Sequence, residues 1–169
     1  MKDQRPEPKH QRPVRVAIGV GSNVGRRSAT VALAAERLAS LLTETFQSTV
    51  IETEPEGEGL GDQPLYLNAV VVGETTLPAR DLLNALLDIE REFGRERPYA
   101  GAPRTLDLDL LLFGDAVIDE PGLQVPHPRF RDRFFVLGPL AEIGPDFRDP
   151  VTGLTVSELL RRLLRDESR

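Results

Sequence analysis

Two acidic residues inside an apolar segment, Asp107 and Asp109, are the feature of this sequence that most directly suggests chemistry. The residues that alternate with them at the spacing of a half-buried strand are Leu106, Leu108, Leu110 and Leu112. The leucines are therefore expected on one face and both carboxylates on the other, with Cα atoms roughly 6.5–7 Å apart. A cation between them would relieve their repulsion, and oxygen ligands suit Mg²⁺ or Mn²⁺. The plainer alternative is a pair of acids that faces water.

Cationic groups surround this segment in the sequence. Arg104 lies two residues before Leu106 and offers a planar guanidinium suited to phosphate, while Arg95 and Arg97 lie in the run that leads into this segment. Such runs are usually solvated, but this position favours contact with an anion. His127 lies further on, between two prolines that restrict its backbone. A lone histidine is more often structural than catalytic. Its position after the acidic pair favours a functional role without establishing one.

A third set of candidate residues opens the strand predicted over residues 66–73. Tyr66 and Asn68 share one face of it and follow a long loop over residues 54–64, which could act as a lid. An aromatic ring beside an amide suits a flat heterocyclic ligand. Hydrogen bonding of a buried tyrosine and asparagine to nearby backbone explains the pair equally well.

Composition limits the classes of protein. The 169 residues predict one domain over residues 14–169, after a disordered leader over 1–13 that is rich in proline and lacks an apolar segment. With 21 basic against 27 acidic residues and a net charge of -6, broad nucleic-acid binding is not expected. There is no cysteine for a disulfide, and no apolar run of about 18 residues for a membrane span. We therefore expect a cytoplasmic protein.

The order of the predicted elements indicates the fold. In chain order they are strand 14–20, helix 28–42, strand 46–53, strand 66–73, a helix from Pro78 to Gly94, strand 103–113, an edge strand near 117–118, helix 132–142 and a last helix whose capping box is Thr155–Glu158. The first six predict an α+β, ferredoxin-like βαββαβ sandwich, with helices on one face of an antiparallel sheet and long active-site loops on the open face. Gly19, Gly21 and Gly25 predict a turn at which the backbone approaches a loop or ligand, since their spacing does not match a dinucleotide-binding fingerprint.

Four motifs together resemble a known family. They are Gly21-Ser22-Asn23, Tyr66-Leu67-Asn68-Ala69, Arg104-Thr105-Leu106-Asp107-Leu108-Asp109 and Val125-Pro126-His127-Pro128. In this order the chain resembles the 6-hydroxymethyl-7,8-dihydropterin pyrophosphokinases of folate biosynthesis, over roughly residues 14–146. The resemblance implies a ferredoxin-like fold and transfer of the β,γ-diphosphate of ATP to the hydroxymethyl group of the pterin, with release of AMP.

The resemblance also implies roles for individual residues. The catalytic set would be Arg95, Arg104, Asp107 and Asp109, with both aspartates as ligands of two Mg²⁺ ions. The pterin would be bound by Thr53, Tyr66, Asn68 and Phe135. ATP would be bound by Glu90, Arg97, Arg104, Leu110, His127 and Arg133. The implied partners are these two small molecules, for a monomer that binds neither nucleic acid nor membrane.

The sequence departs from the family in the loop before Arg104. Gly101 and Ala102 stand where many members have Trp-Gly, so an aromatic cap from this loop must come from Tyr99 or be absent. A non-catalytic ferredoxin-like module that binds a nucleotide or RNA is the alternative, since residues 129–133 are basic and RNA-binding domains share this topology. A metal-dependent nuclease built on the aspartates is a weaker third hypothesis.

Overall fold

A central antiparallel sheet organises the chain, and the computed structural model describes it through residues 12–55, 64–94 and 105–169. Strand β1 (Val14–Ser22) lies between β4 (Tyr66–Thr75) and β5 (Asp107–Phe113). Strands β2 (Thr43–Gln47) and β3 (Ile51–Thr53) both pair with β4, which gives the order β2-β4-β1-β5. This is the order expected of a ferredoxin-like arrangement, so the predicted fold class is confirmed.

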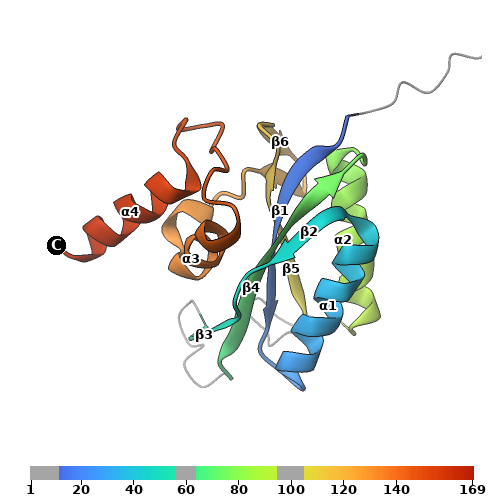
Figure 1. Cartoon of the computed structure of the whole chain (residues 1–169). Helices are drawn as coiled ribbons and strands as arrows, with labels where there is room; N and C mark the ends of the chain where they lie inside the picture. The colour runs from blue at the N-terminus through green and yellow to red at the C-terminus, as the bar shows by residue number, and fades with distance from the viewer. Residues whose placement is uncertain (1–11, 56–63, 95–104) are drawn as a thin grey trace, which may run out of the picture.

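Two crossover helices, α1 (Arg27–Leu41) and α2 (Ala79–Glu92), cover one face of the sheet (Figure 1). The apolar residues of α2 recur at helical spacing, and the buried ones include Leu82, Leu86 and Ile89. Pro78 is the residue directly before the helix, and Gly94 follows its end with a φ of 72°. The two helices pack on the side chains that β1, β4 and β5 direct to this face, and these form the first of two buried cores.

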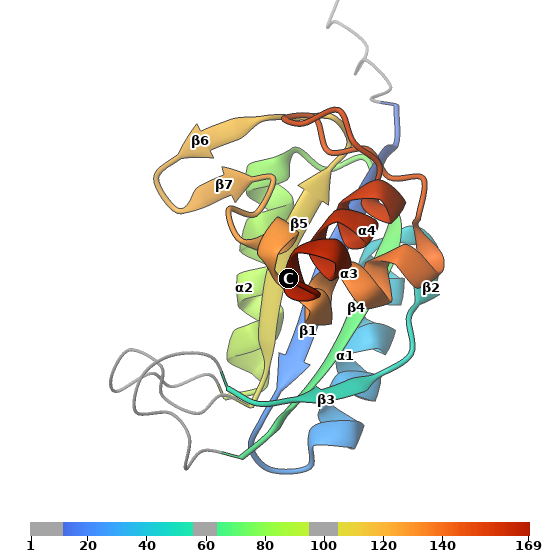
Figure 2. The same ribbon diagram turned by 90° about the vertical axis from the view of Figure 1, so that its left-hand side faces the viewer.

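The second face is also covered by helices, which corrects the expectation that it would be open. Helix α3 (Phe134–Ile143) lies against it, and α4 (Val156–Glu167) packs on α3 (Figures 1 and 2). The short 3₁₀ helix η1 (Phe130–Asp132) contacts both of these helices. The cause is apolar sheet surface on that side, including Val70 and Val72, which must be removed from water. The predicted capping box is confirmed, since Thr155 and Glu158 exchange both hydrogen bonds at the start of α4.

A β-bulge in β5 overturns part of the predicted alternation. Ile18 pairs with Leu110 and Ala17 with Leu112, so Leu111 is an extra residue on β5. Leu112 therefore packs in the second core together with Leu111, while Leu106, Leu108 and Leu110 remain in the first. The prediction that Leu112 shares a face with the other three leucines was wrong. Asp107 and Asp109 precede the bulge, so their common face is unaffected.

The strand predicted over residues 46–53 is divided into β2 and β3 by Ser48. The backbone N–H of Ser48 donates to the carbonyl of Val70 at 2.9 Å, and its hydroxyl accepts from the N–H of Val70 at 2.8 Å. A side chain thus replaces one backbone acceptor of the ladder, and the strand bends there. The short edge strand expected near residues 117–118 is a hairpin of β6 (Ile118–Glu120) and β7 (Leu123–Val125), which forms a separate sheet.

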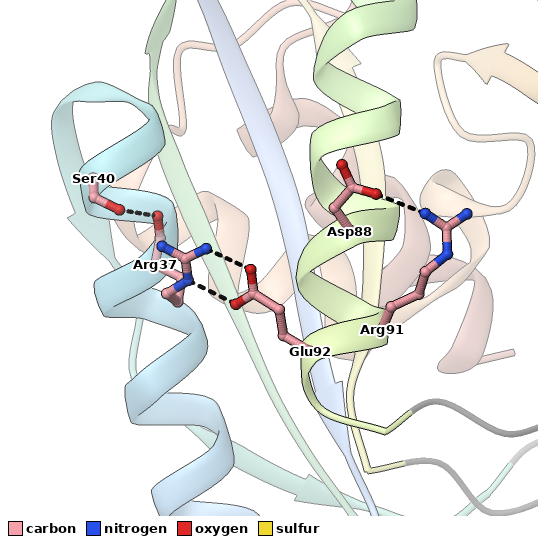
Figure 3. A network of polar contacts seen from close by, with 5 residues as sticks. All are labelled: Arg37, Ser40, Asp88, Arg91 and Glu92. Carbon is pink, nitrogen blue, oxygen red and sulfur yellow. Dashed lines mark hydrogen bonds and ion pairs between the residues drawn. The ribbon is translucent and has the colours of Figure 1, made fainter.

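An exposed ion pair joins the two crossover helices near the end of α2 (Figure 3). The guanidinium of Arg37 donates to both carboxylate oxygens of Glu92, at 3.0 and 2.7 Å. Within α2, Arg91 donates to Asp88 at 2.6 Å. Throughout the described ranges, no helix combines the length and the apolar character needed to cross a membrane.

Candidate active site

Two glycines of the central strand form the floor of the site. Gly21 is paired with Asn68 on one side and Asp107 on the other, and Gly19 is flanked in the same way by Val70 and Asp109. A Cβ atom on Gly21 would lie 3.1 Å from Oδ1 of Asn68. The glycines therefore leave space between the outer strands. The predicted turn was wrong at these two positions, which lie inside β1.

A cavity of about 300 Å³ stands over this floor and brings the predicted pterin residues together. Those that line it are Thr53, Tyr66, Asn68 and Phe135. They come from β3, β4 and the first turn of α3, which are distant in sequence. Tyr66 pairs with Thr53 in the sheet, and Asn68 is only 9% exposed. A tyrosine ring, a phenylalanine ring and a buried amide thus face one concave space.

The amide of Asn68 is oriented by its neighbour on β3. Its Nδ2 group donates to the hydroxyl of Thr53 at 2.6 Å. Its Oδ1 atom is directed toward Gly21, since it would be the nearest neighbour of a Cβ atom on that glycine. The amide therefore presents fixed donor and acceptor positions at the cavity wall, which is the arrangement that recognises a polar heterocycle edge.

Both aspartates of β5 line the same cavity, next to the histidine that the sequence placed downstream. Asp107, Asp109 and His127 all contribute to its wall. The peptide between Val125 and Pro126 is cis, and the N–H of His127 donates to the carbonyl of Leu111 at 2.9 Å. The segment after β7 is thereby attached to β5 at its bulge, which holds the imidazole close to the aspartates.

The ring of His127 is neutral near pH 7. Burial lowers the pKa of His127, the positive charge of Arg133 lowers it further, and Asp107 acts in the opposite direction. Its Nδ1 atom accepts a hydrogen bond from the N–H of Arg129 at 3.2 Å. The neutral ring therefore carries its proton on Nε2 and can donate a hydrogen bond from that atom.

A cationic side chain and an aromatic ring lie together at the start of α3. The guanidinium of Arg133 is 5.4 Å from the ring centroid of Phe135, within the range of a cation–π contact, and both line the cavity. Arg133 was predicted to bind ATP, and the structure places it on the wall that also holds the aromatic residue predicted for the pterin.

A second groove, of about 630 Å³, runs along the outer edge of β5. Leu110, predicted to contact ATP, lines it, as do Gly122 and Gln124 of the β6–β7 hairpin. Asp109 and His127 line both this groove and the first cavity. The two spaces therefore meet at one carboxylate and one imidazole.

Some predicted site residues are not brought together. Glu90 is 1% exposed on α2 and lines neither space, so the structure does not place it at the predicted ATP site. Arg95, Arg97 and Arg104 lie outside the described residues. Val136 was missed as a lining residue, whereas Gly19 and Gly21 were predicted to approach a loop or ligand, although in a turn and not as the floor of a cavity. Alternating glycines inside a strand of β-branched residues were the signal for the floor.

Comparison with known proteins identifies the family. A family model described as 7,8-dihydro-6-hydroxymethylpterin-pyrophosphokinase (HPPK) matches residues 17–145. A Pseudomonas aeruginosa protein named 2-amino-4-hydroxy-6-hydroxymethyldihydropteridine pyrophosphokinase is 44% identical over 149 residues, 86% of this chain and 90% of that protein. A Synechocystis protein of the same name is 46% identical over 101 residues, 60% of this chain and 52% of that protein.

Solved structures support the fold independently. A crystal structure of wild-type Plasmodium falciparum HPPK-DHPS is similar with a TM-score of 0.72 at 14% identity, covering 95% of this chain and 46% of that one. The chain thus spans about half the length of this structure and of the Synechocystis relative. The family match covers most of the described residues and includes both aspartates and His127. The chain therefore belongs to the 7,8-dihydro-6-hydroxymethylpterin-pyrophosphokinase family.

Proposed function

We propose that this chain performs the reaction of its family, transferring the β,γ-diphosphate of ATP to the hydroxymethyl group of 6-hydroxymethyl-7,8-dihydropterin in folate biosynthesis. The observation that carries the proposal is the meeting of two spaces at Asp109 and His127. One space has the aromatic and amide groups that suit a planar acceptor, and the other extends along the sheet edge. A diphosphate bound at their junction would lie between acceptor and donor.

The acceptor would bind in the first cavity. The rings of Tyr66 and Phe135 offer faces for stacking on a pterin, and Asn68 offers an amide for its polar edge. The bond from Asn68 to Thr53 fixes that amide before the substrate arrives, which lowers the entropic cost of binding.

The aspartates fit a magnesium site that is completed by substrate. The described residues contain no group of three or more histidine, cysteine, aspartate or glutamate side chains that could hold a metal. Mg²⁺ is commonly held by only one or two carboxylates, with phosphate and water oxygens as its other ligands, so Asp107 and Asp109 suffice. Two bound Mg²⁺ ions would supply neutralisation of the phosphate charge during transfer.

The remaining chemistry is positioning and charge. The hydroxymethyl oxygen bonds to the β-phosphorus and loses its proton to water, while the bond from that phosphorus to the α,β-bridging oxygen breaks, so AMP leaves with that oxygen. His127 would donate from Nε2 to a phosphate oxygen, and Arg133 would add positive charge nearby. We assign Arg95 and Arg104 the same role toward the phosphates on the basis of sequence. No covalent enzyme intermediate is required.

The test measures AMP from the purified chain with ATP, Mg²⁺ and the hydroxymethyl-dihydropterin. Wild type should release AMP only when all three are present, and absence of AMP would refute the proposal. Asp107→Asn should abolish turnover without unfolding the protein. Asp115→Asn, the same change at an exposed position after β5, is the matched control and should be active.

The alternative function predicts a different result for the same purified protein. A non-catalytic nucleotide-binding module would bind ATP without Mg²⁺ and release no AMP. We also predict a monomeric, cytoplasmic enzyme, and the elution volume in gel filtration tests the first of these two predictions.

A further inference from the structure

A fully buried carboxylate lies outside both cavities, in the segment between α3 and α4. Asp149 is 0% exposed. Its two oxygens accept hydrogen bonds from Nε and Nη2 of Arg131 at 2.6 and 2.8 Å. They also accept from the N–H of Val151 at 3.0 Å and the hydroxyl of Thr152 at 2.7 Å. Asp149 thus makes a bidentate ion pair with Arg131 of η1, and the turn that contains Asp149 donates its other two hydrogen bonds.

Arg131 is the middle residue of η1 and lies between two residues that line the first cavity. His127 lies four residues before it, and Phe135 lies four residues after it. The guanidinium also lies 4.7 Å from the ring centroid of Phe130, which is fully buried and whose N–H donates to the carbonyl of His127 at 3.2 Å. A shift of Arg131 would therefore be transmitted to the backbone of His127.

The turn that presents Asp149 is itself fixed. Its N–H donates to the carbonyl of Leu154 and its carbonyl accepts from the N–H of Gly153, both at 2.8 Å. The N–H of Val156 donates to the carbonyl of Phe147 at 2.7 Å, and both of these side chains are buried in the second core. The carboxylate is therefore held by a part of the molecule that contacts neither cavity.

We propose that Asp149 is a positioning residue for the transfer reaction, which acts by holding Arg131 and so fixing the backbone from His127 to Phe135. This inference rests on the proposed function, because the roles of His127 and Phe135 at the phosphates and the pterin come from it. The merely structural alternative is that the pair only stabilises the turn after α3. The two explanations predict different activities for a variant that is folded but lacks the ion pair.

The decisive variants are Asp149→Asn, Arg131→Lys and the double variant Arg131→Gln/Asp149→Asn. The single changes remove the charge or the planar fork, and the double change leaves no unpaired buried charge. Arg37→Gln is the matched control, since it breaks another bidentate arginine pair, which is exposed and whose residues, Arg37 and Glu92, line neither cavity. Thermal unfolding curves identify a temperature at which every variant is folded, and kcat and KM for both substrates are measured at that temperature.

Positioning predicts that all three variants lose roughly 10- to 100-fold in kcat/KM for the pterin, because a displacement of about 1 Å has such an effect on a catalytic arrangement. The double variant should lose as much as the single ones, and Arg37→Gln should match wild type. Wild-type kcat/KM in the folded double variant would overturn the inference, because it would leave only the structural role.

Hydrogen exchange tests the same inference without turnover. The amides of His127 and Phe130 should exchange faster in Asp149→Asn than in wild type, while those of β1 stay equally protected. Unchanged exchange at His127 and Phe130 would overturn the inference. If wild type released no AMP, the proposed function would fail by itself, and the exchange rates would still decide whether Asp149 fixes this segment.

Discussion

The buried carboxylate of Asp149 should make the stability of this protein depend on acid in a defined way. Burial by itself would raise the pKa of Asp149, but hydrogen bonds from Arg131, Thr152 and Val151 outweigh it and lower the pKa from 3.8 to about 2. A carboxylate whose pKa is lower in the folded state adds stability above its unfolded pKa. That contribution is lost as the pH falls from about 4 toward 2.

The size of the effect follows from the two pKa values. The gap between 3.8 and about 2 corresponds to about 2 kcal/mol of unfolding free energy, at 1.36 kcal/mol for each pKa unit. This is a large fraction of the typical stability of a domain. Asp149→Asn keeps the size of the side chain and removes its charge, so it should lose about this amount at neutral pH.

The assay is urea unfolding of wild type and Asp149→Asn at about pH 7, 4.5, 3.5 and 2.5. We expect the stability difference between them to be largest at the two higher values and to shrink at the lowest. A difference that is the same at both ends of this range would refute the reasoning, because the ionised carboxylate would then not be its source. Arg37→Gln, on an exposed pair, should show no comparable dependence.

Three further substitutions test the site and its support. Gly21→Ala should weaken pterin binding about tenfold or more and leave ATP binding unchanged in a fluorescence titration, because its Cβ would lie 3.1 Å from Oδ1 of Asn68. Ser48→Ala should lower the unfolding free energy by about 1–3 kcal/mol in urea, since it leaves the buried N–H of Val70 without its acceptor. Thr155→Ala removes the N-cap of α4 and should cost about 0.5–2 kcal/mol in thermal unfolding, whereas Thr155→Ser should restore most of it.

Elements with strong local periodicity could be predicted from the sequence. The helix expected over residues 28–42 is α1, and the strand expected over 66–73 is β4 with two more residues. The bulge at Leu111 could not be predicted, because the run Leu110-Leu111-Leu112-Phe113 is apolar on either face and gives no signal of a register change. Helix α3 covers the second face of the sheet because apolar residues lie there. In the sequence, these residues were also consistent with a strand that is buried on both faces, so they did not indicate which element would cover them.

The site could be predicted where its residues lie two apart on one strand. Asp107 with Asp109, and Tyr66 with Asn68, share a face because of the strand period alone. Contacts that join distant segments had no such signal. The pairing of Gly21 with both Asn68 and Asp107 depends on strand order, and the bond from Arg131 to Asp149 depends on how η1 meets the turn after α3.

If the proposed function holds, the row Asn68–Gly21–Asp107 would let the sheet, more than the loops, set the geometry of the two substrates. Neighbouring strands lie about 4.8 Å apart, so the side chains of the outer two are separated by about 10 Å across a position without a side chain. A flat ring held at Asn68 can therefore extend over Gly21 toward Asp107, where the diphosphate would be bound. Because these distances are fixed by backbone hydrogen bonds of three strands, we expect the departure from Trp-Gly at Gly101 and Ala102 to change the rate of turnover and to leave the alignment of acceptor and metal ligands intact.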